Sequence, residues 1–328
     1  MPETLAFSAI TQAADRLHGY ASRTPLLQSA ALNAATGANV FLKPENLQRT
    51  GSFKFRGAFN RLAQLSEAEK RAGVVAWSSG NHAQGVAAAA QILGLSATIV
   101  MPFDAPVVKR EQTERYGADI VFYDRYAEDR EAIGRRLARE RGATLVPSYD
   151  DFDIMAGQGT AGLELAEDVS KQKSALDALL VCCGGGGLSA GMATAFQQLS
   201  PQTKLYSVEP EDFNDHQRSL RSGVRESNAE EARSLCDALL STTPGELTFP
   251  INKALLSGGL CVSDAAVKRA MRFAFESLKL VLEPGGAVAL AAALEGALDL
   301  QGANVGVVLS GGNVDPALFQ SILYENTA

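Results

Sequence analysis

The feature that most constrains the fold is an alternation of short β-branched runs with longer segments of helical periodicity, separated by Gly or Pro. Such an alternation favours right-handed crossovers, and therefore parallel strands with helices on both faces of the sheet. In its clearest stretch we expect strands near 73–77, 97–101, 119–123 and 143–146, and helices near 82–93, 106–116 and 127–141.

A second set of strands is expected near 178–183, 205–208 and 305–309, with a helix after Gly187. Two sets predict an α/β protein with two open, twisted, mostly parallel sheets that carry helices on both faces. Because ligands of such sheets bind beyond the carboxyl ends of the strands, the segments that follow each strand are the candidate sites.

Composition narrows the class of partner. A chain of 328 residues is long enough for about two domains at roughly 150 residues each. The net charge of −7, with basic residues scattered along the chain, argues against binding to nucleic acid or to an anionic membrane surface. We therefore expect a small-molecule ligand.

The cysteines and the N-terminal sequence indicate the cellular compartment of the protein. The four cysteines, at 182, 183, 236 and 261, lack the paired spacing of a zinc site or a redox dithiol and are expected to be free thiols. The N-terminus lacks a signal-peptide pattern, and no apolar stretch is long enough to span a bilayer. A cytoplasmic location is expected.

Two motifs match enzyme signatures in a context that does not fit them. Residues 157–162 (GQGTAG) match GxGxxG but do not directly follow a strand, so we expect a glycine-rich helix start that packs closely against a neighbour. Residues 187–191 (GLSAG) match the nucleophile elbow of serine hydrolases. An open glycine loop precedes Ser189, and the only histidine after it is His216, so a hydrolase is the less favoured alternative.

The glycine loop itself is a candidate phosphate site. Gly184, Gly185, Gly186 and Gly187 lie between a buried strand and a helix, where consecutive backbone N–H groups and the helix dipole favour an anion. No Gly-Lys-Ser/Thr follows, which argues against a nucleotide-binding loop of the Walker type.

Lys54 is the candidate nucleophile or base. It opens a helix whose apolar face is formed by Phe55, Phe59 and Leu62. A lysine at a helix N-terminus experiences positive potential, which lowers its pKa and favours the reactive neutral amine.

Polar groups follow two other strands. The segment 78–82 (SSGNH) contains Ser78, Ser79, Asn81 and His82 at the start of a helix, where hydroxyl, amide and N–H groups suit a carboxylate; simple helix capping is the alternative. Ser310 follows the last strand and could cap it or contact a ligand.

Taken together, these motifs resemble the serine/threonine dehydratase and serine racemase family, which are pyridoxal 5′-phosphate (PLP) enzymes of fold-type II. The resemblance covers about residues 23–315. It is carried by the segments 43–48 (KPENLQ), 50–58 (TGSFKFRGA), 78–82 (SSGNH), 184–188 (GGGGL), 283–287 (EPGGA) and 310–313 (SGGN).

The resemblance implies a role for each motif, with the cofactor in a cleft between two domains. Lys54 would hold the cofactor aldehyde as a Schiff base beside Phe53, and Asn81 would contact the ring hydroxyl. Ser310 would contact the pyridine nitrogen, and because a neutral hydroxyl does not hold that nitrogen protonated, elimination is favoured. The phosphate would be bound by the backbone N–H groups of Gly184, Gly185, Gly186, Gly187 and Leu188.

The implied activity is that of an ammonia-lyase converting L-threonine or L-serine to a 2-oxo acid and ammonia. Ser78, Ser79, Asn81 and His82 would hold the α-carboxylate, and released Lys54 would take the Cα proton. Ser79 matches the opposite-face acid/base of the racemases. Serine racemase and 3-hydroxyaspartate dehydratase are therefore the alternatives, and the latter needs a cation for a second carboxylate that the sequence does not identify.

A cation site is also implied. Glu209, the backbone carbonyl of Phe213 and Asp215 resemble the divalent-cation ligands of the racemases, and oxygen donors suit Mg²⁺ or Ca²⁺. A solvated acidic loop is the alternative.

The resemblance implies a discontinuous large domain (1–72 and 148–328) that binds the phosphate. A small inserted domain (73–147) would carry the carboxylate loop. A homodimer is implied as well. Because only 15 residues follow Asn313, we expect no C-terminal regulatory domain of the kind found in biosynthetic threonine deaminases.

Overall fold

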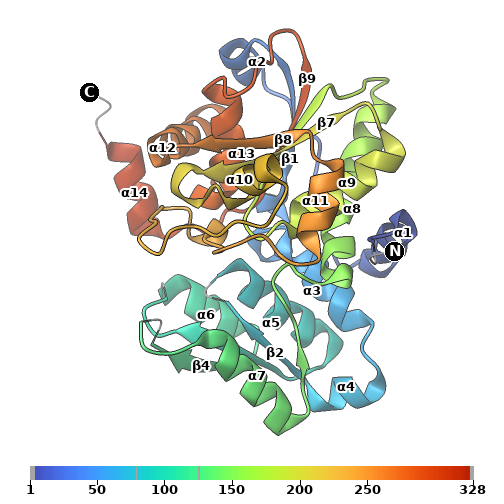
Figure 1. Ribbon diagram of the computed structural model, residues 1–328, viewed down its shortest axis with the longest axis vertical. Coiled ribbons are helices and arrows are strands. Elements are labelled where there is room, and N and C mark those ends of the chain that lie inside the picture. The colour runs from blue at the N-terminus through green and yellow to red at the C-terminus, as the bar shows by residue number, and fades with distance from the viewer. Residues whose placement is uncertain (1–3, 79, 106, 125, 326–328) are drawn as a thin grey trace.

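The strands of the computed structural model are divided between two parallel sheets (Figure 1). The model describes residues 4–78, 80–105, 107–124 and 126–325. The larger sheet has the order β1-β9-β6-β7-β8 and the smaller one β4-β3-β2-β5, and every pair of neighbouring strands in them is parallel. The strands are β1 (Asn39–Pro44), β2 (Val74–Trp77), β3 (Ala97–Pro102), β4 (Asp119–Tyr123), β5 (Thr144–Leu145), β6 (Ala178–Cys182), β7 (Lys204–Pro210), β8 (Gly258–Val262) and β9 (Asn304–Leu309).

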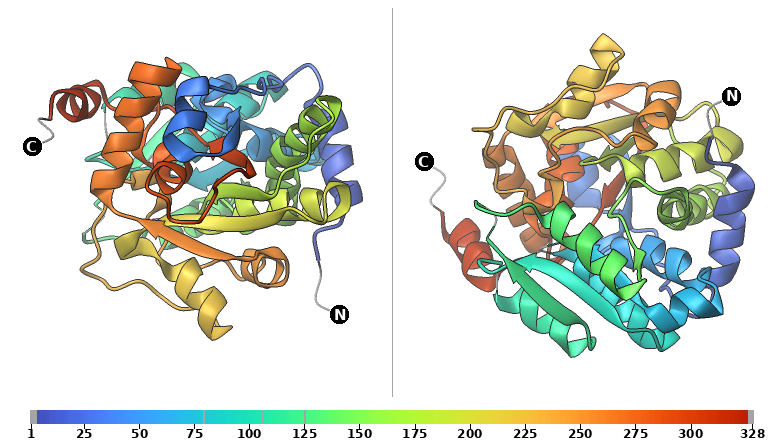
Figure 2. Two further views of the ribbon diagram at one scale, coloured as in Figure 1. Left: turned by 90° about the horizontal axis from the view of Figure 1, so that it is seen from above. Right: turned by 60° about the horizontal axis from the view of Figure 1, so that its bottom comes forward.

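Helices cover both sheets, and the expected α/β class with two parallel sheets is confirmed. In Figure 1 the larger sheet occupies the upper half and the smaller sheet the lower half, and Figure 2 (right) brings the smaller sheet forward. The helices are α1 (Phe7–Leu17), α2 (Ala30–Thr36), α3 (Lys54–Ala63), α4 (Glu67–Ala72), α5 (Asn81–Leu93), α6 (Val107–Arg115), α7 (Arg130–Arg141), α8 (Phe152–Lys171), α9 (Gly187–Leu199), α10 (Asp215–Ser222), α11 (Thr248–Leu255), α12 (Asp264–Phe273), α13 (Pro284–Leu294) and α14 (Pro316–Tyr324).

Most element limits agree with the sequence pattern within a few residues, and the exceptions have local causes. The helix expected from residue 127 begins at Arg130, because Asp129 caps it by accepting hydrogen bonds from the N–H groups of Glu131 and Ala132. The pattern did not predict β1 and β8. The first contains a lysine and a proline, and the second begins with two glycines.

The smaller sheet is built from strands that lie between residues 74 and 145. Its apolar cluster nevertheless includes Phe55, Phe59 and Leu62 of α3, which precedes all of its strands. Because α3 also packs against α8, it lies between the two sheets. The domain limits expected at residues 73 and 147 remain a prediction.

The GxGxxG segment lies within α8, which begins at Phe152, rather than at the start of a helix as expected. Close packing explains its glycines. A Cβ at Gly157 would lie 2.5 Å from the carbonyl oxygen of Arg56 on α3, and one at Gly159 would lie 2.8 Å from that of Gly191 on α9. These glycines allow the backbones of α3, α8 and α9 to approach one another.

A buried ion network fixes the first turn of α3. Arg56 donates through Nε and Nη2 to the two carboxylate oxygens of Glu45, at 2.7 and 2.8 Å, and through Nη1 and Nη2 to those of Glu164, at 2.8 Å each. Lys43 donates to Glu164 at 2.6 Å. The side chains of Arg56 and Glu45 are 1% and 0% exposed, so each charge depends on its partner for solvation.

Among the described residues, no helix combines the length and the apolar character that crossing a membrane requires.

The network gives a stability prediction. Glu45→Gln leaves the Arg56 guanidinium buried with one of its carboxylates missing, and we expect the free energy of unfolding to fall by about 3 kcal/mol. Glu67→Gln, at an exposed i,i+3 pair with Lys70, should leave it nearly unchanged, because solvent screens this pair. Urea-induced unfolding measures both. Equal effects of the two variants would contradict the role of the network.

Candidate active site

The site begins where the two ends of the chain meet. β1 and β9 pair in register up to Pro44 and Leu309, so the segments that follow them leave the same edge of the larger sheet. The backbone N–H of Phe53 donates to the carbonyl of Ser310 at 3.1 Å, and Ser52 forms a β-bridge with Gly311. Lys54 and Ser310 are thereby brought to the same edge of the larger sheet.

Lys54 is the first residue of α3, and its amine is buried. Nζ donates to the backbone carbonyl of Ser148 at 2.8 Å and lies 5.2 Å from the centre of the Phe53 ring. Burial lowers the pKa of Lys54 to about 8, although Cys182 and Glu283 act to raise it. The expected direction agrees, but the main cause is desolvation rather than the helix N-terminus.

The glycine loop is held with its carbonyls bonded to neighbouring groups. The Gly185 carbonyl accepts from Thr248 Oγ1 at 2.6 Å, and the Gly186 carbonyl accepts from Ser189 Oγ at 3.0 Å and Asn252 Nδ2 at 3.1 Å. With the carbonyls engaged in this way, the N–H groups at the start of α9 remain available for an anion.

Two positions of this loop require glycine. Gly186 has a φ of 94°, and a Cβ there would lie 2.7 Å from Cε1 of His216. A Cβ at Gly185 would overlap the ring of Tyr149. Leu188, the second residue of α9, is buried. The glycine loop, called the glycine cradle below, therefore has no room for a side chain at Gly185 or Gly186.

Ser189, the serine of the GxSxG match, is fully buried, and its hydroxyl donates to the Gly186 carbonyl. His216 is instead bonded to Asn252, at 3.0 Å. The serine therefore supports the loop, and the arrangement does not resemble a hydrolase elbow.

The described part of the 78–82 loop is bonded within the protein. Ser78 Oγ accepts from the N–H of Gly80 at 3.2 Å. Asn81 donates to Glu283 and accepts from Asn313 Nδ2 at 2.8 Å. Ser79, expected to hold the carboxylate and to act on the opposite face, lies outside the described residues.

His82 is buried and neutral. Its Nε2 bonds the Val146 carbonyl at 2.9 Å, and since a carbonyl only accepts, Nε2 carries the ring proton. Burial, with help from the charge of Lys54, lowers its pKa to about 3. His82 can therefore donate to a bound carboxylate through its backbone N–H at the start of α5, but not through its ring.

Sequence patterns did not reveal a set of charges, two of them buried, that crosses between the two sheets. Lys109, on α6 of the smaller sheet, forms an ion pair with Asp237 and lies 3.9 Å from Glu283, next to α13 of the larger sheet. Burial raises the pKa of Glu283 to about 7, while Lys109 acts to lower it. The pKa of Lys109 is raised, because Glu283 and Asp237 outweigh the effect of burial.

Lys109 also faces the carboxylate loop, since a Cβ at Gly80 would lie 3.3 Å from its Nζ. Its positive charge favours an anionic group bound there. The only sequence signal for the group as a whole was the EPGGA segment that contains Glu283.

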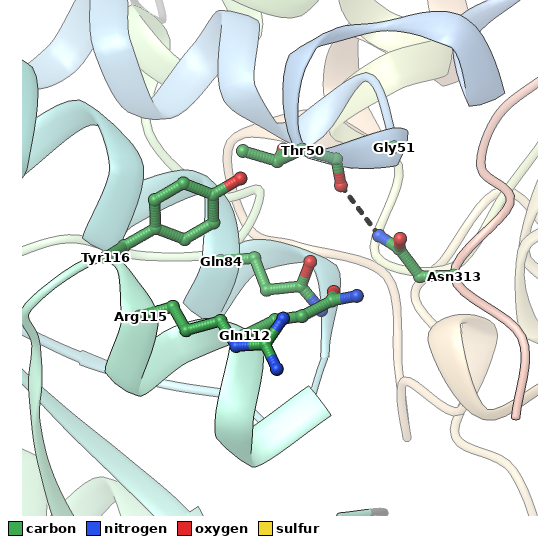
Figure 3. A pocket seen from close by; sticks show the side chains of 7 residues that line it. All are labelled: Thr50, Gly51, Gln84, Gln112, Arg115, Tyr116 and Asn313. Carbon is green, nitrogen blue, oxygen red and sulfur yellow. Dashed lines mark hydrogen bonds between the residues drawn. The ribbon is translucent and has the colours of Figure 1, made fainter. Parts of the chain in front are cut away.

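A separate pocket of about 450 Å³ adjoins this region (Figure 3). Asn313 belongs to both, since it donates to Asn81 and, at 2.8 Å, to the carbonyl of Thr50. Neither Lys54 nor the glycine loop lines this pocket, whose walls are formed by Thr50, Gly51, Gln84, Gln112, Arg115, Tyr116 and Asn313.

The expected cation ligands follow β7. Glu209 and Asp215 are buried, and together with His216 they form a cluster whose potential ligand atoms lie within 4.8 Å of one another. Both oxygens of Glu209 accept backbone N–H groups, from His216 at 2.9 Å and Gln217 at 2.7 Å. Within the described part of the chain, Asp215 Oδ2 has no hydrogen-bond partner.

The electrostatics of the pair suit a cation. Burial, and then the charge of Asp215, raise the pKa of Glu209 well above its usual range, and burial raises that of Asp215 to about 6. Phe213, whose carbonyl was the third expected ligand, is the last residue of the short 3₁₀ turn (Glu211–Phe213) between them. An unpartnered carboxylate oxygen beside a second buried carboxylate fits a hard divalent ion.

Fold and site together define an α/β enzyme in which a buried amine and a glycine cradle share one edge of a parallel sheet. The chain matches the family model of pyridoxal-phosphate dependent enzymes over residues 18–311 and belongs to that family. The cofactor expected from the motifs is thus supported, and the cradle and the buried Lys54 fit it.

Relatives with three different activities resemble the chain over almost its whole length. The L-threo-3-hydroxyaspartate ammonia-lyase of a Pseudomonas species is 50% identical, over 97% of this chain and 98% of the relative. The serine racemase of Schizosaccharomyces pombe is 42% identical over 94% of each chain. The crystal structure of a threonine deaminase from T.th. is 43% identical, with a TM-score of 0.89 over 94% of this chain and 99% of the other.

The buried amine predicts a stability effect. With a pKa of about 8 in the folded chain against 10.5 unfolded, burying the protonated amine costs about 3 kcal/mol below pH 8, and this penalty disappears as the pH rises to 10.5. Lys54→Met should therefore stabilise the cofactor-free protein by up to about that amount at pH 7, and by much less at pH 10.

Urea unfolding at the two pH values measures this effect. Lys204→Met, at an exposed position of β7, is the control for loss of a lysine side chain. A Lys54→Met protein less stable than the wild type at pH 7 would contradict the burial penalty.

Proposed function

We propose that the chain is a PLP-dependent ammonia-lyase that eliminates the β-hydroxyl of a small L-hydroxy amino acid and releases a 2-oxo acid and ammonia. The observation that carries the proposal is the buried Lys54 amine, whose lowered pKa gives it a large neutral fraction near pH 8. Family membership supplies the cofactor.

Each motif has a role in this proposal. The N–H groups of Gly184, Gly185, Gly186, Gly187 and Leu188 bind the phosphate. Phe53 packs against the ring, Asn81 contacts the ring hydroxyl, and Ser310 contacts the pyridine nitrogen. Pyridoxal phosphate, when bound, withdraws electrons from the Cα–H bond of an amino acid joined to its aldehyde carbon.

Lys54 is the base in the chemical step. Its neutral amine accepts the Cα proton of the substrate, and its bond to the Ser148 carbonyl keeps the amine oriented. The segment 78–82 holds the α-carboxylate through N–H groups at the start of α5 and through serine hydroxyls, with the nearby Lys109 charge favouring the anion. Ser79 remains the predicted opposite-face acid/base.

The substrate is proposed as L-threonine or L-serine, with L-threo-3-hydroxyaspartate as the second candidate. The second candidate is included because the chain is 50% identical to a hydroxyaspartate ammonia-lyase. The three differ in one group on the β-carbon, which is hydrogen in serine, methyl in threonine and carboxylate in 3-hydroxyaspartate. All three carry the hydroxyl that leaves. Serine racemisation is the related alternative, since it begins with the same loss of the Cα proton.

A substrate panel tests the proposal. We expect 2-oxo acid from at least one of L-threonine, L-serine and L-threo-3-hydroxyaspartate, at a rate reduced more than about 10³-fold in Lys54→Ala and unchanged in Lys204→Ala. Chiral analysis of residual serine measures racemisation. Full turnover by Lys54→Ala, or no product from any hydroxy amino acid, would contradict the assignment.

Glu209, Asp215 and the Phe213 carbonyl are further proposed as ligands of Mg²⁺ or Ca²⁺. Asp215→Asn should weaken binding of Mg²⁺ at least about tenfold in isothermal titration calorimetry, because it removes one of two carboxylate ligands. Asp212→Asn, at an exposed position of the same loop, should not. Equal affinity in both variants would place the cation elsewhere.

The homodimer and the cytoplasmic location remain predictions from the family resemblance and from composition.

A further inference from the structure

His216 lies between the proposed cation site and the glycine loop. It is the second residue of α10, directly after Asp215, and is fully buried. Its backbone N–H donates to Glu209 Oε1 at 2.9 Å. The position of this residue is thus tied to Glu209 by a hydrogen bond and to Asp215 by its place in the chain.

The ring of His216 is tied to the loop. Nε2 lies 3.0 Å from Asn252 Nδ2, which also donates to the Gly186 carbonyl at 3.1 Å. A side-chain amide nitrogen only donates, so Nε2 is the acceptor in this contact. The same edge of the ring faces Gly186, where a Cβ would lie 2.7 Å from Cε1 and 2.8 Å from Nε2.

Gly186 is the position at which the loop depends most on support. Its φ of 94° is outside the range that other residues readily adopt, and it immediately precedes α9. A shift of the His216 ring would move Asn252 or Gly186. Either movement would change the direction of the N–H groups that face the phosphate.

We propose that His216 is a positioning residue that couples the cation site to the glycine loop, so that a divalent cation and the phosphate of the cofactor bind cooperatively. The proposal rests on the cation site proposed above, but not on the identity of the substrate.

The coupling has a simple physical origin. Among the described residues, one buried oxygen of Asp215 has no hydrogen-bond partner, and ligand atoms of Glu209 and Asp215 lie within 4.8 Å of each other, so a cation can join the two side chains. A cation held by both fixes Asp215 and therefore the His216 ring beside Gly186. Because linkage is reciprocal, the phosphate must strengthen cation binding by the same factor.

Cofactor binding provides a measurement that does not depend on turnover. The cofactor-free protein is titrated with PLP in the presence of Mg²⁺ and, separately, of EDTA. Binding is followed by the fluorescence of the single tryptophan, Trp77, which directly precedes the 78–82 loop. We expect Mg²⁺ to lower the Kd of PLP at least about fivefold, the lower end of typical coupling between sites. Calorimetric titration of Mg²⁺ with and without PLP should give the same factor.

Variants separate the coupling from general stability. His216→Ala and Asn252→Ala should each remove the Mg²⁺ dependence of the PLP affinity. His216→Gln, whose amide oxygen can accept the Asn252 proton, should retain part of it and serves if the alanine variants do not fold. His18→Ala, at the exposed end of α1, is the matched control and should retain all of it.

The outcomes distinguish the two proposals. If calorimetry detects no Mg²⁺ binding to the wild type, the cation site fails and the coupling fails with it. If Mg²⁺ binds but leaves the PLP affinity unchanged, or if His216→Ala keeps the full dependence, the coupling alone is overturned.

Discussion

The arrangement of the site depends on the buried guanidinium of Arg56. It lies two residues after Lys54 in the first turn of α3, and its fork of donors reaches Glu45 after β1 and Glu164 on α8. A planar group with several fixed donors specifies both the position and the rotation of a helix, which a single point charge does not. The direction in which Lys54 points is therefore determined by a contact on the other side of the helix.

That direction places the amine where burial leaves it only partly solvated. The same burial that lowers the pKa of Lys54 to about 8 also destabilises the cofactor-free protein, so reactivity and stability are opposed at this residue. Glu283 shows the complementary effect, with a pKa raised to about 7 by burial. Asn81 and Lys109 reach Glu283 from the smaller sheet, so the two sheets are connected by polar contacts at the site.

Sequence predicted the parts of the site that are local. The four glycines and Ser310 could be found because a residue type that suits a ligand directly follows a strand, and parallel sheets bring such positions to one edge. Lys54 could be found because it opens a helix with an apolar face. The roles of Lys109, Asn252 and His216 could not be found, because they depend on contacts between residues that are far apart in the chain. The cause of the Lys54 pKa shift was also inaccessible, since burial depends on the whole fold.

Among the strands and helices, too, local sequence patterns predicted some features, while others depend on contacts between distant parts of the chain. Alternating patterns located the four strands of the smaller sheet and most of the larger one, whereas β8, which begins with two glycines and is half-buried, carries no such pattern. The glycines of α8 match a binding motif, but their sequence context already favoured close packing, and contacts with α3 and α9 explain them.

The most direct test of the central claim is to identify the residue that carries the cofactor. Borohydride reduction of the PLP-loaded protein, followed by proteolysis and mass spectrometry, should find the pyridoxyl group on the peptide that contains Lys54, and on no other lysine. Attachment at another lysine, or an unmodified Lys54 in a protein that turns over substrate, would contradict the account.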